Sequence, residues 1–327
     1  MGSIFEYINS VEAHPEIVSV LKHGDYSRCK SPIISVIMPV YKRPELLRKA
    51  IKSVLDQDAS FEFEVVIVDN YDEDISPNYE IARSFNDDRI FYYQNEKNLG
   101  MYGNFNRGIL LARGKYISFC HDDDLFPVNA LSTLYKIKKE NNKECIIGEN
   151  TTIDMNDNIT SVPKYPCKLL FIFRLKEYFK LSMFDLMVKC PGNGGGGCLF
   201  DKEVLVSLGG FNELLFPGCD YALILNYAKK YGAVQTPLVT YNYRIGDNCS
   251  FEVAGVYAQI TKSFHLEIRH YVNLPKIITN FIVFVINENI KASCSEVWKI
   301  DNNTKKTKWC KIAWVFLNRI VKIKAYL

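Results

Sequence analysis

The segment FCHDDDLFP, residues 119–127, contains three consecutive carboxylates, Asp122, Asp123 and Asp124. An apolar run, GKYISFC, comes directly before them and predicts a buried strand that ends at this acidic triplet. Three adjacent negative charges repel one another, and carboxylate oxygens are ligands that Mg²⁺ and Mn²⁺ prefer. Because Mg²⁺ sites commonly combine one or two carboxylates with phosphate oxygens of a substrate, the triplet predicts a divalent metal beside a phosphorylated ligand.

The acidic triplet has a second interpretation, because aspartate also favours solvated loops and the N-terminal caps of helices. Its position at the end of a buried strand favours the ligand-binding interpretation. Two other ways of holding phosphate are not indicated, since the chain has neither a G-x-G-x-x-G motif after a strand nor a G-x-x-x-x-G-K-[ST] loop.

Two further polar residues stand where predicted strands end. Asp69 closes the apolar run EVVIVDN and can accept hydrogen bonds from a base or a ribose, although aspartate there is equally typical of a turn. Arg43 follows the run SVIMPVY and can contact phosphate, although an arginine at this place is also typical of a surface helix.

Alternating elements predict the scaffold that brings these residues together. Apolar runs predict strands over 31–41, 61–70, 89–95 and 115–124. Helices are predicted over 42–58, 78–86, 98–114 and 128–141. This alternation is typical of a doubly wound α/β domain, in which ligands bind beyond the carboxyl ends of the strands. Tyr41, Arg43, Asp69 and the acidic triplet are therefore expected to converge.

The rest of the chain supports coarser expectations. Residues 1–30 predict a helical or irregular lead-in, and the chain is expected to be helical from about residue 252. Ten cysteines without C-x-x-C pairs predict reduced thiols in the cytoplasm. The N-terminus does not resemble a signal peptide, and no apolar run reaches the ~20 residues that a membrane span needs. A net charge of +3 does not indicate a nucleic-acid partner, and none is predicted.

Four segments in this order resemble glycosyltransferase family 2: SVIMPVYKRPELLRKAIKSVLDQ, EVVIVDN, NLGMYGNFNRGILLARGKYISFCHDDD and LGGFNE. The resemblance covers about residues 33 to 250. It implies a GT-A-type fold, a Rossmann-like mixed α/β sheet flanked by helices, and a nucleoside-diphosphate sugar donor. It also implies an inverting mechanism with Mn²⁺ or Mg²⁺. The expected organisation is a lead-in over 1–30, a glycosyltransferase domain over 31–250 and a helical C-terminal extension over 251–327.

The resemblance also implies roles for individual residues. Asp123 and Asp124 are favoured as metal ligands, and Asp122 is expected toward the ribose, although His121 stands where the family often has the first aspartate. Asp69 matches the carboxylate that reads the base. The other nucleotide-sugar-binding residues predicted in this half of the chain are Pro39, Val40, Tyr41, Arg43, Asn98, Gly100 and Asn104.

The second half of the chain is expected to supply the catalytic base. The family's Glu-Asp pair matches FPGCDYAL, in which Cys219 replaces the glutamate and Asp220 is the candidate base. A helix N-cap is the alternative role for Asp220. Arg244 is expected near the diphosphate, although the histidine that follows in the family pattern is replaced by Gly246. The GNGGGG run over 192–197 predicts close backbone approach to a ligand or a mobile loop.

The C-terminal tail over 304–327 mixes apolar and aromatic residues with lysine and arginine. Tryptophan and basic residues favour the membrane interface, so the tail predicts peripheral attachment to the inner face of the cytoplasmic membrane. A terminal helix packed on the domain is the alternative.

These residues together predict a metal-dependent inverting hexosyltransferase. The expected donor is a UDP-sugar, and the expected acceptor is a polyprenyl-diphosphate-linked saccharide in O-antigen or capsule synthesis. A nucleotidyltransferase and a catalytically inactive sugar- or lipid-binding module are the alternatives.

Overall fold

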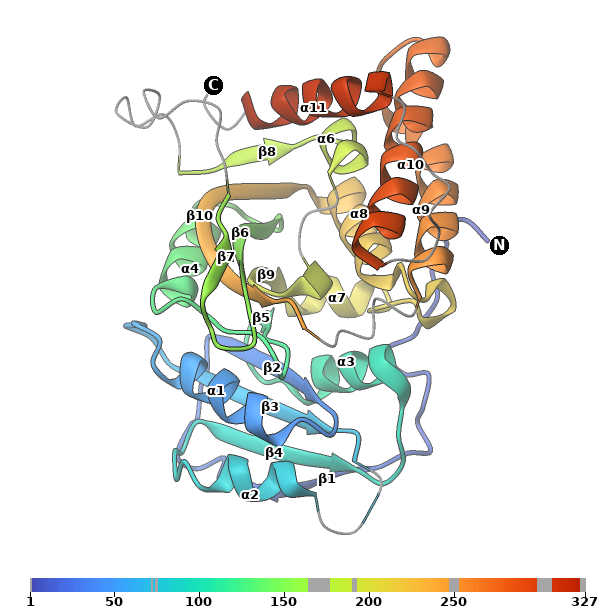
Figure 1. Ribbon diagram of the computed structural model, residues 1–327. Coiled ribbons are helices and arrows are strands. Elements are labelled where there is room, and N and C mark those ends of the chain that lie inside the picture. The colour runs from blue at the N-terminus through green and yellow to red at the C-terminus, as the bar shows by residue number, and fades with distance from the viewer. Residues whose placement is uncertain are drawn as a thin grey trace.

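The computed structural model describes residues 2–71, 73, 76–163, 177–189, 193–246, 253–298 and 308–323 (Figure 1). The elements up to residue 140 are β1 (Ser19–His23), β2 (Ile34–Val40), α1 (Pro44–Leu55), β3 (Phe63–Asp69), α2 (Pro77–Arg83), β4 (Ile90–Asn95), α3 (Gly100–Leu111), β5 (Tyr116–Phe119) and α4 (Ala130–Glu140). The alternation of strands and helices predicted from residue 31 onward is confirmed.

The second half begins with shorter elements and ends in long helices. Its elements are β6 (Cys145–Ile153), β7 (Ile159–Ser161), β8 (Phe179–Leu181), α6 (Met183–Val188), η1 (Asn193–Gly195), β9 (Cys198–Asp201), α7 (Lys202–Ser207), η2 (Glu213–Leu215), α8 (Cys219–Tyr231), β10 (Ala233–Arg244), α9 (Ala254–Ile268), η4 (Arg269–Tyr271), α10 (Lys276–Trp298) and α11 (Lys308–Ile323).

Within the described residues, the strands form one ten-stranded sheet in the order β1-β4-β3-β2-β5-β9-β6-β10-β8, with β7 paired to β6. Parallel pairing joins β4 to β3, β3 to β2 and β2 to β5, whereas β9 runs antiparallel to β5 and β6. The carboxyl ends of β2 to β5 therefore lie at one edge of the sheet, and the loops that carry most of the predicted site residues begin there.

Helices cover both faces of this mixed sheet, as the predicted α/β class requires (Figure 1). One face is covered by α1, α2 and α4, and the other by α3, α7 and α8. Helix α1 buries Leu47, Ala50, Ile51 and Val54, the three- and four-residue spacing of an amphipathic helix. Such packing fixes the loop between β2 and α1, where Tyr41 and Arg43 lie.

Two expectations about strand limits are wrong. Residues Ser19–His23 of the lead-in form an edge strand, β1, that pairs antiparallel with β4. Its five residues, SVLKH, are too few and too mixed in polarity to give a strand pattern. The strand predicted over 115–124 ends at Phe119, opposite Ile37 of β2, so the acidic triplet lies in the turn after the strand.

The helical C-terminal extension is confirmed in the described residues. Ile260 and Phe264 of α9 and Ile282 of α10 belong to the same hydrophobic cluster as α8 and α3. Helix α11 joins this cluster through Leu317 and Val321. No helix among the described residues has both the length and the apolar character needed to cross a membrane.

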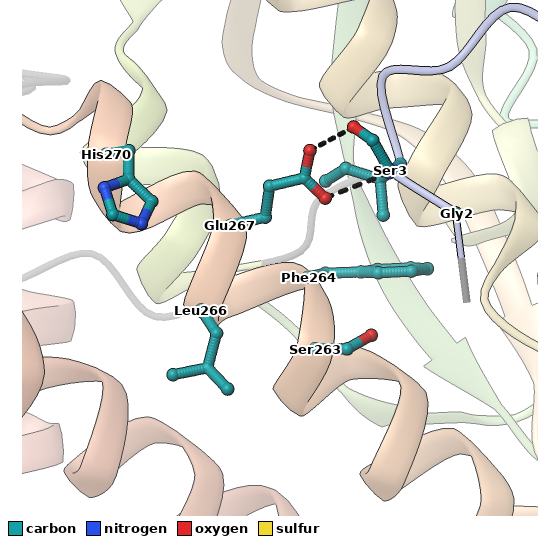
Figure 2. A pocket seen from close by; sticks show the side chains of 8 residues that line it. Gly2, Ser3, Ser263, Phe264, Leu266, Glu267 and His270 are labelled. Carbon is teal, nitrogen blue, oxygen red and sulfur yellow. Dashed lines mark hydrogen bonds between the residues drawn. The ribbon is translucent and has the colours of Figure 1, made fainter.

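The N-terminal lead-in packs against this extension. Glu267 of α9 accepts hydrogen bonds from the Ser3 hydroxyl and, at 3.0 Å, from the Ile4 N–H (Figure 2). Asn226 of α8 donates to the Ile4 carbonyl from the other side. The contacts lie beside a surface hollow of about 380 Å³, and they join the first residues of the chain to its last helices.

A buried histidine ties α9 to α8 and α10. His265 Nδ1 lies 2.8 Å from Asn287 Oδ1, and Nε2 lies 3.2 Å from the Tyr221 hydroxyl. The ring is almost fully buried, and burial lowers the pKa of His265 to about 4, although the hydrogen bond to Asn287 opposes this shift. The folded protein therefore keeps this ring neutral in mildly acidic solution.

We expect the contribution of His265 to the stability of the protein to fall as the pH drops below about 6.5. The pKa of His265 falls from 6.5 to about 4 on folding, so the unfolded chain binds the proton at higher pH than the folded protein does. This protonation lowers the free energy of the unfolded state relative to the folded state. Between pH 7 and pH 5 this difference amounts to about 2 kcal/mol. Urea unfolding of wild type and His265→Gln at both pH values measures it. The exposed His270 supplies the control, His270→Gln, which should keep the wild-type pH dependence; an identical dependence in His265→Gln would contradict the prediction.

Candidate active site

A cavity of about 700 Å³ opens at the carboxyl edge of β2 to β5. Most of the predicted site residues line it, and they come from loops and helices far apart in the sequence. These are Pro39, Val40, Tyr41, Arg43, Asn98, Gly100, Asn104, Asp122, Asp123 and Asp220. The expected convergence of these residues is therefore present in the fold, whereas their individual roles stay predictions.

The turn after β5 places two of the three carboxylates in the cavity. Asp122 accepts a hydrogen bond from the Tyr41 N–H at 3.1 Å. Arg43 forms an ion pair with Asp123, and its Nη1 also lies 3.6 Å from Asp122 Oδ1. Burial, and then the charge of Asp123, raise the pKa of Asp122 even though Arg43 and the Tyr41 N–H lower it. The turn thus favours a positively charged ligand.

The third carboxylate, Asp124, lies beneath the cavity and is fully buried. Its oxygens accept from the Tyr241 hydroxyl at 2.7 Å and from the Arg244 N–H at 2.6 Å. His121 Nδ1 lies 3.2 Å from the same carboxylate. Burial disfavours protonation of His121, but the hydrogen bond to Asp124 and the charges of Asp124 and Asp123 outweigh it and raise the pKa of the imidazole to about 9.

The residues of this turn fit a divalent cation. One ligand atom each from His121, Asp123 and Asp124 lies within 4.8 Å of the others. Two carboxylates and an imidazole are an ordinary ligand set for such an ion. The Nε2 atom of His121 is also buried with no hydrogen-bond partner among the described residues, which is unusual for a polar atom. Asp123 is the carboxylate of this group that lines the cavity.

Asp220 faces the same cavity from the first turn of α8. Its Oδ2 accepts from the Gly194 N–H at 3.0 Å, and its Oδ1 accepts from the Tyr221 N–H at 2.8 Å. Burial raises the pKa of this carboxyl, although both N–H groups and His121 oppose the shift. The neighbouring Cys219 is fully buried in the core, so the position of the family's glutamate points away from the cavity here.

The described part of the glycine run closes over the acidic turn. Gly194 lines the cavity with a φ of +63°, which favours glycine. A Cβ atom there would lie 2.7 Å from Cε1 of His121, so only glycine allows this approach. Gly192, the first residue of the predicted run, lies outside the described residues.

Asp69 does not line the cavity. It is fully buried and accepts hydrogen bonds from the Tyr92 hydroxyl, from Asn78 Nδ2 at 3.1 Å and from the Tyr71 N–H at 2.9 Å. These contacts hold the N-terminus of α2 against β3. Asn70, the next residue, lines the cavity in its place. The base-reading role assigned to Asp69 is not supported by this placement.

Arg244 also lies outside the cavity lining. Its backbone N–H donates to Asp124, and Nε donates to the Asp123 carbonyl at 2.6 Å. Its guanidinium also donates to the Asp154 carbonyl and pairs with Asp157 at 2.6 Å. The side chain is almost fully buried, so it braces the acidic turn, and the predicted contact with a diphosphate is not supported.

Several residues that line the cavity were not predicted from the sequence. Asn70 donates to the Gly100 carbonyl at 2.8 Å and accepts from Asn95 at 2.8 Å, which ties β3 to α3. It ends the apolar run EVVIVDN, so the signal that selected Asp69 was equally available for Asn70. Tyr257 of α9 and Tyr243 of β10 also line the cavity. Tyr243 directly precedes Arg244 in the family pattern, whereas no local pattern marks Tyr257.

The family model of glycosyl transferase family 2 matches residues 35–209. This match spans more than half of the chain, and the chain belongs to that family. The resemblance of the four sequence segments is thereby confirmed.

Two bacterial relatives show what the chain is similar to. It is 30% identical over 205 residues to a putative colanic acid biosynthesis glycosyl transferase, WcaA, of Escherichia coli, which covers 62% of this chain and 68% of that protein. It is 29% identical over 272 residues to a GalNAc(5)-diNAcBac-PP-undecaprenol β-1,3-glucosyltransferase of Campylobacter jejuni, covering 82% and 81%.

The structure resembles the crystal structure of Staphylococcus aureus TarS residues 1–349 in complex with UDP-GlcNAc. The TM-score is 0.58 at 15% identity, over 87% of this chain and 79% of that chain. At this identity the likeness shows the fold, and the expected GT-A-type architecture is confirmed.

Proposed function

We propose that this glycosyltransferase is an inverting, metal-dependent enzyme that moves a hexose from a UDP-sugar to a hydroxyl of a lipid-linked saccharide in O-antigen or capsule synthesis. The observation that carries this proposal is the convergence of Asp123, His121 and Asp220 on one cavity at the carboxyl edge of the sheet. An acidic cation site and a separate carboxylate are the two parts that inverting transfer needs.

Asp220 is the proposed catalytic base. Transfer breaks the bond between the anomeric carbon and the diphosphate and builds oxocarbenium-like charge on the sugar. The acceptor hydroxyl attacks from the opposite face, and Asp220 takes its proton. The N–H groups of Gly194 and Tyr221 hold both carboxylate oxygens in place. Inversion of an α-linked donor gives a β-glycoside.

The acidic turn is proposed to hold Mn²⁺ or Mg²⁺ through Asp123 and Asp124, with His121 as a further candidate ligand. A divalent cation bound there would stabilise the leaving diphosphate as a Lewis acid. Asp122 is proposed to face the ribose, and Arg43, which pairs with Asp123, is proposed to bind the nucleotide-sugar. Pro39, Val40, Tyr41, Asn98, Gly100 and Asn104, with Asn70, are proposed to line the nucleotide-sugar site.

The proposed donor and acceptor rest on different support. TarS has been crystallised with UDP-GlcNAc and has the same fold, which favours a UDP-linked sugar. The name of the Campylobacter jejuni relative describes an undecaprenol-linked substrate, which favours a polyprenyl-diphosphate-linked saccharide as acceptor. Tyr257 and Pro217 line the same cavity as Asp220 and offer apolar surface on which a sugar ring can stack.

Peripheral attachment to the inner face of the cytoplasmic membrane is proposed as well. The described part of the tail forms α11, which is held by Leu317 and Val321 and exposes Ile312, Val315 and Phe316. Both interpretations of the tail are thus compatible with this helix, because one side packs on the protein and another side is free to meet lipid.

We expect the purified protein to hydrolyse one UDP-sugar slowly in the presence of Mn²⁺ and not in the presence of EDTA. Water replaces the acceptor hydroxyl in this assay, so no acceptor is needed. A panel of UDP-, GDP- and dTDP-sugars, followed by nucleotide release, tests donor and metal together. Release that is equal with Mn²⁺ and EDTA would contradict the metal proposal, and release from a GDP- or dTDP-sugar alone would contradict the UDP proposal.

A further inference from the structure

The first turns of α10 present an apolar face to solvent. Ile277, Phe281 and Phe284 are spaced four and three residues apart and are 80%, 59% and 55% exposed. Side chains at this spacing lie on one side of a helix. Leu274 and Ile278 are also exposed and extend the surface, which is called the α10 face below. Contiguous exposed apolar surface of this kind indicates an interaction site.

The opposite side of α10 is buried in the core, so the exposed residues of the α10 face are not core residues that lack packing partners. Ile282, Val283 and Ile286 are buried in the cluster shared with α8 and α9. These buried residues already hold the helix in place, and the exposed Phe281 and Phe284 do not contribute to that packing. Two exposed phenylalanines on an anchored helix lower solubility unless another surface covers them.

The charge around the α10 face favours an anionic partner. Between Glu267 and Glu288 the sequence has no acidic residue, whereas it contains Arg269, His270 and Lys276. Helix α11, which contacts α10, exposes Arg319 and has no acidic residue in its sequence. It exposes Ile312, Val315 and Phe316. Both helices lie at the end of the molecule opposite β1 and α2 (Figure 1).

We propose that the α10 face docks on an anionic lipid bilayer, with Phe281 and Phe284 inserted at the boundary between head groups and acyl chains. Exposed aromatic and aliphatic side chains beside basic residues are the chemistry that such an interface selects. A second copy of the chain is a weaker candidate, because Arg269 and Lys276 flank the apolar residues, whereas the nearest acidic side chain of α10, Glu288, is already paired with Lys291. The inference rests on the proposed membrane association and deepens it by assigning the contact to α10 in addition to the tail.

The test is co-sedimentation of the full chain with vesicles of phosphatidylglycerol and phosphatidylcholine, compared with phosphatidylcholine alone. Wild type should bind the anionic vesicles, and added salt should weaken the binding. The double variant Phe281→Ser/Phe284→Ser should lose affinity at least about tenfold. Val128→Ser, which removes an exposed apolar residue before α4, is the matched control and should bind like wild type.

Three outcomes would overturn the inference. The first is that the double variant binds the vesicles as tightly as wild type. This includes the case in which only the variant Phe316→Ser loses binding, because the tail would then be the anchor without α10. The second is binding by neither protein. The third is a wild-type dimer in size-exclusion chromatography that the double variant converts to a monomer. Donor hydrolysis without vesicles should be equal in both proteins, so loss of vesicle binding is distinguishable from failure of the proposed transferase activity.

Discussion

Replacing Asp220 by asparagine is expected to lower the turnover of glycosyl transfer by about 10²–10⁴-fold. The amide keeps the size of the side chain but cannot take a proton from the acceptor hydroxyl. Burial disfavours the charge of Asp220, but the amide leaves the N–H group of either Gly194 or Tyr221 without its acceptor, so the free energy of unfolding should fall by about 1–3 kcal/mol. The measurement is kcat for transfer to a saccharide acceptor, together with the thermal midpoint of each protein.

The matched control for this substitution is Asp201→Asn. Asp201 is also a buried aspartate at the start of a helix, α7, but it lies outside the cavity lining. Its variant should transfer sugar at nearly the wild-type rate. Wild-type kcat in Asp220→Asn would exclude Asp220 as the base and leave it as a residue of the first turn of α8 that only binds the N–H groups of Tyr221 and Gly194.

The pH dependence of sugar transfer also tests the role of Asp220 as the base. Only the ionised form of Asp220 can accept a proton, so activity should rise with pH through the pKa of this carboxyl. Since burial raises that pKa above the ordinary value of 3.8, the acidic limb should lie at higher pH than for an exposed aspartate.

Those parts of the molecule that depend on local pattern could be predicted from the sequence. The strands β2 and β3 are nearly continuous apolar runs because both of their faces are covered, and such runs are visible without a structure. The acidic triplet was found for a related reason, since it directly follows a buried strand. Asp220 has no such local signal and was predicted only through the family resemblance.

Two residues predicted for the site lie outside the cavity lining because of contacts between distant segments. Asp69 stands at a strand end, but Tyr92 and Asn78 bind its carboxylate and leave it no access to the cavity. Arg244 is directed inward by Asp157, a residue of the turn between β6 and β7. No periodicity or motif in the sequence indicates these contacts, because the packing of the sheet decides which of these distant residues lie close together.

Within the acidic triplet, the structure separates two carboxylates that the sequence presents as equivalent. Asp123 lines the cavity and forms an ion pair with Arg43. Asp124 is fully buried and accepts from Tyr241 and Arg244. Removing the charge of Asp123 should therefore weaken the binding of ligands in the cavity. Removing that of Asp124 should also lower the stability of the fold.

Asp123→Asn is accordingly expected to weaken Mn²⁺ binding and to lower metal-dependent donor hydrolysis by at least about 100-fold, with an unchanged thermal midpoint. A metal supplies several kcal/mol of charge stabilisation to the transition state, and each 1.36 kcal/mol is tenfold in rate. Titration calorimetry with Mn²⁺ and nucleotide release measure the two effects.

Asp124→Asn is the companion variant, and it should unfold more easily than wild type by about 1–3 kcal/mol. The amide replaces one carboxylate oxygen by a donor, which leaves a buried hydrogen-bond donor of Tyr241 or of the Arg244 backbone unsatisfied. Urea unfolding of both variants decides between the roles. If Asp123→Asn unfolds as easily as Asp124→Asn, or if it binds Mn²⁺ like wild type, then Asp123 holds the turn together and the cation site must be placed elsewhere.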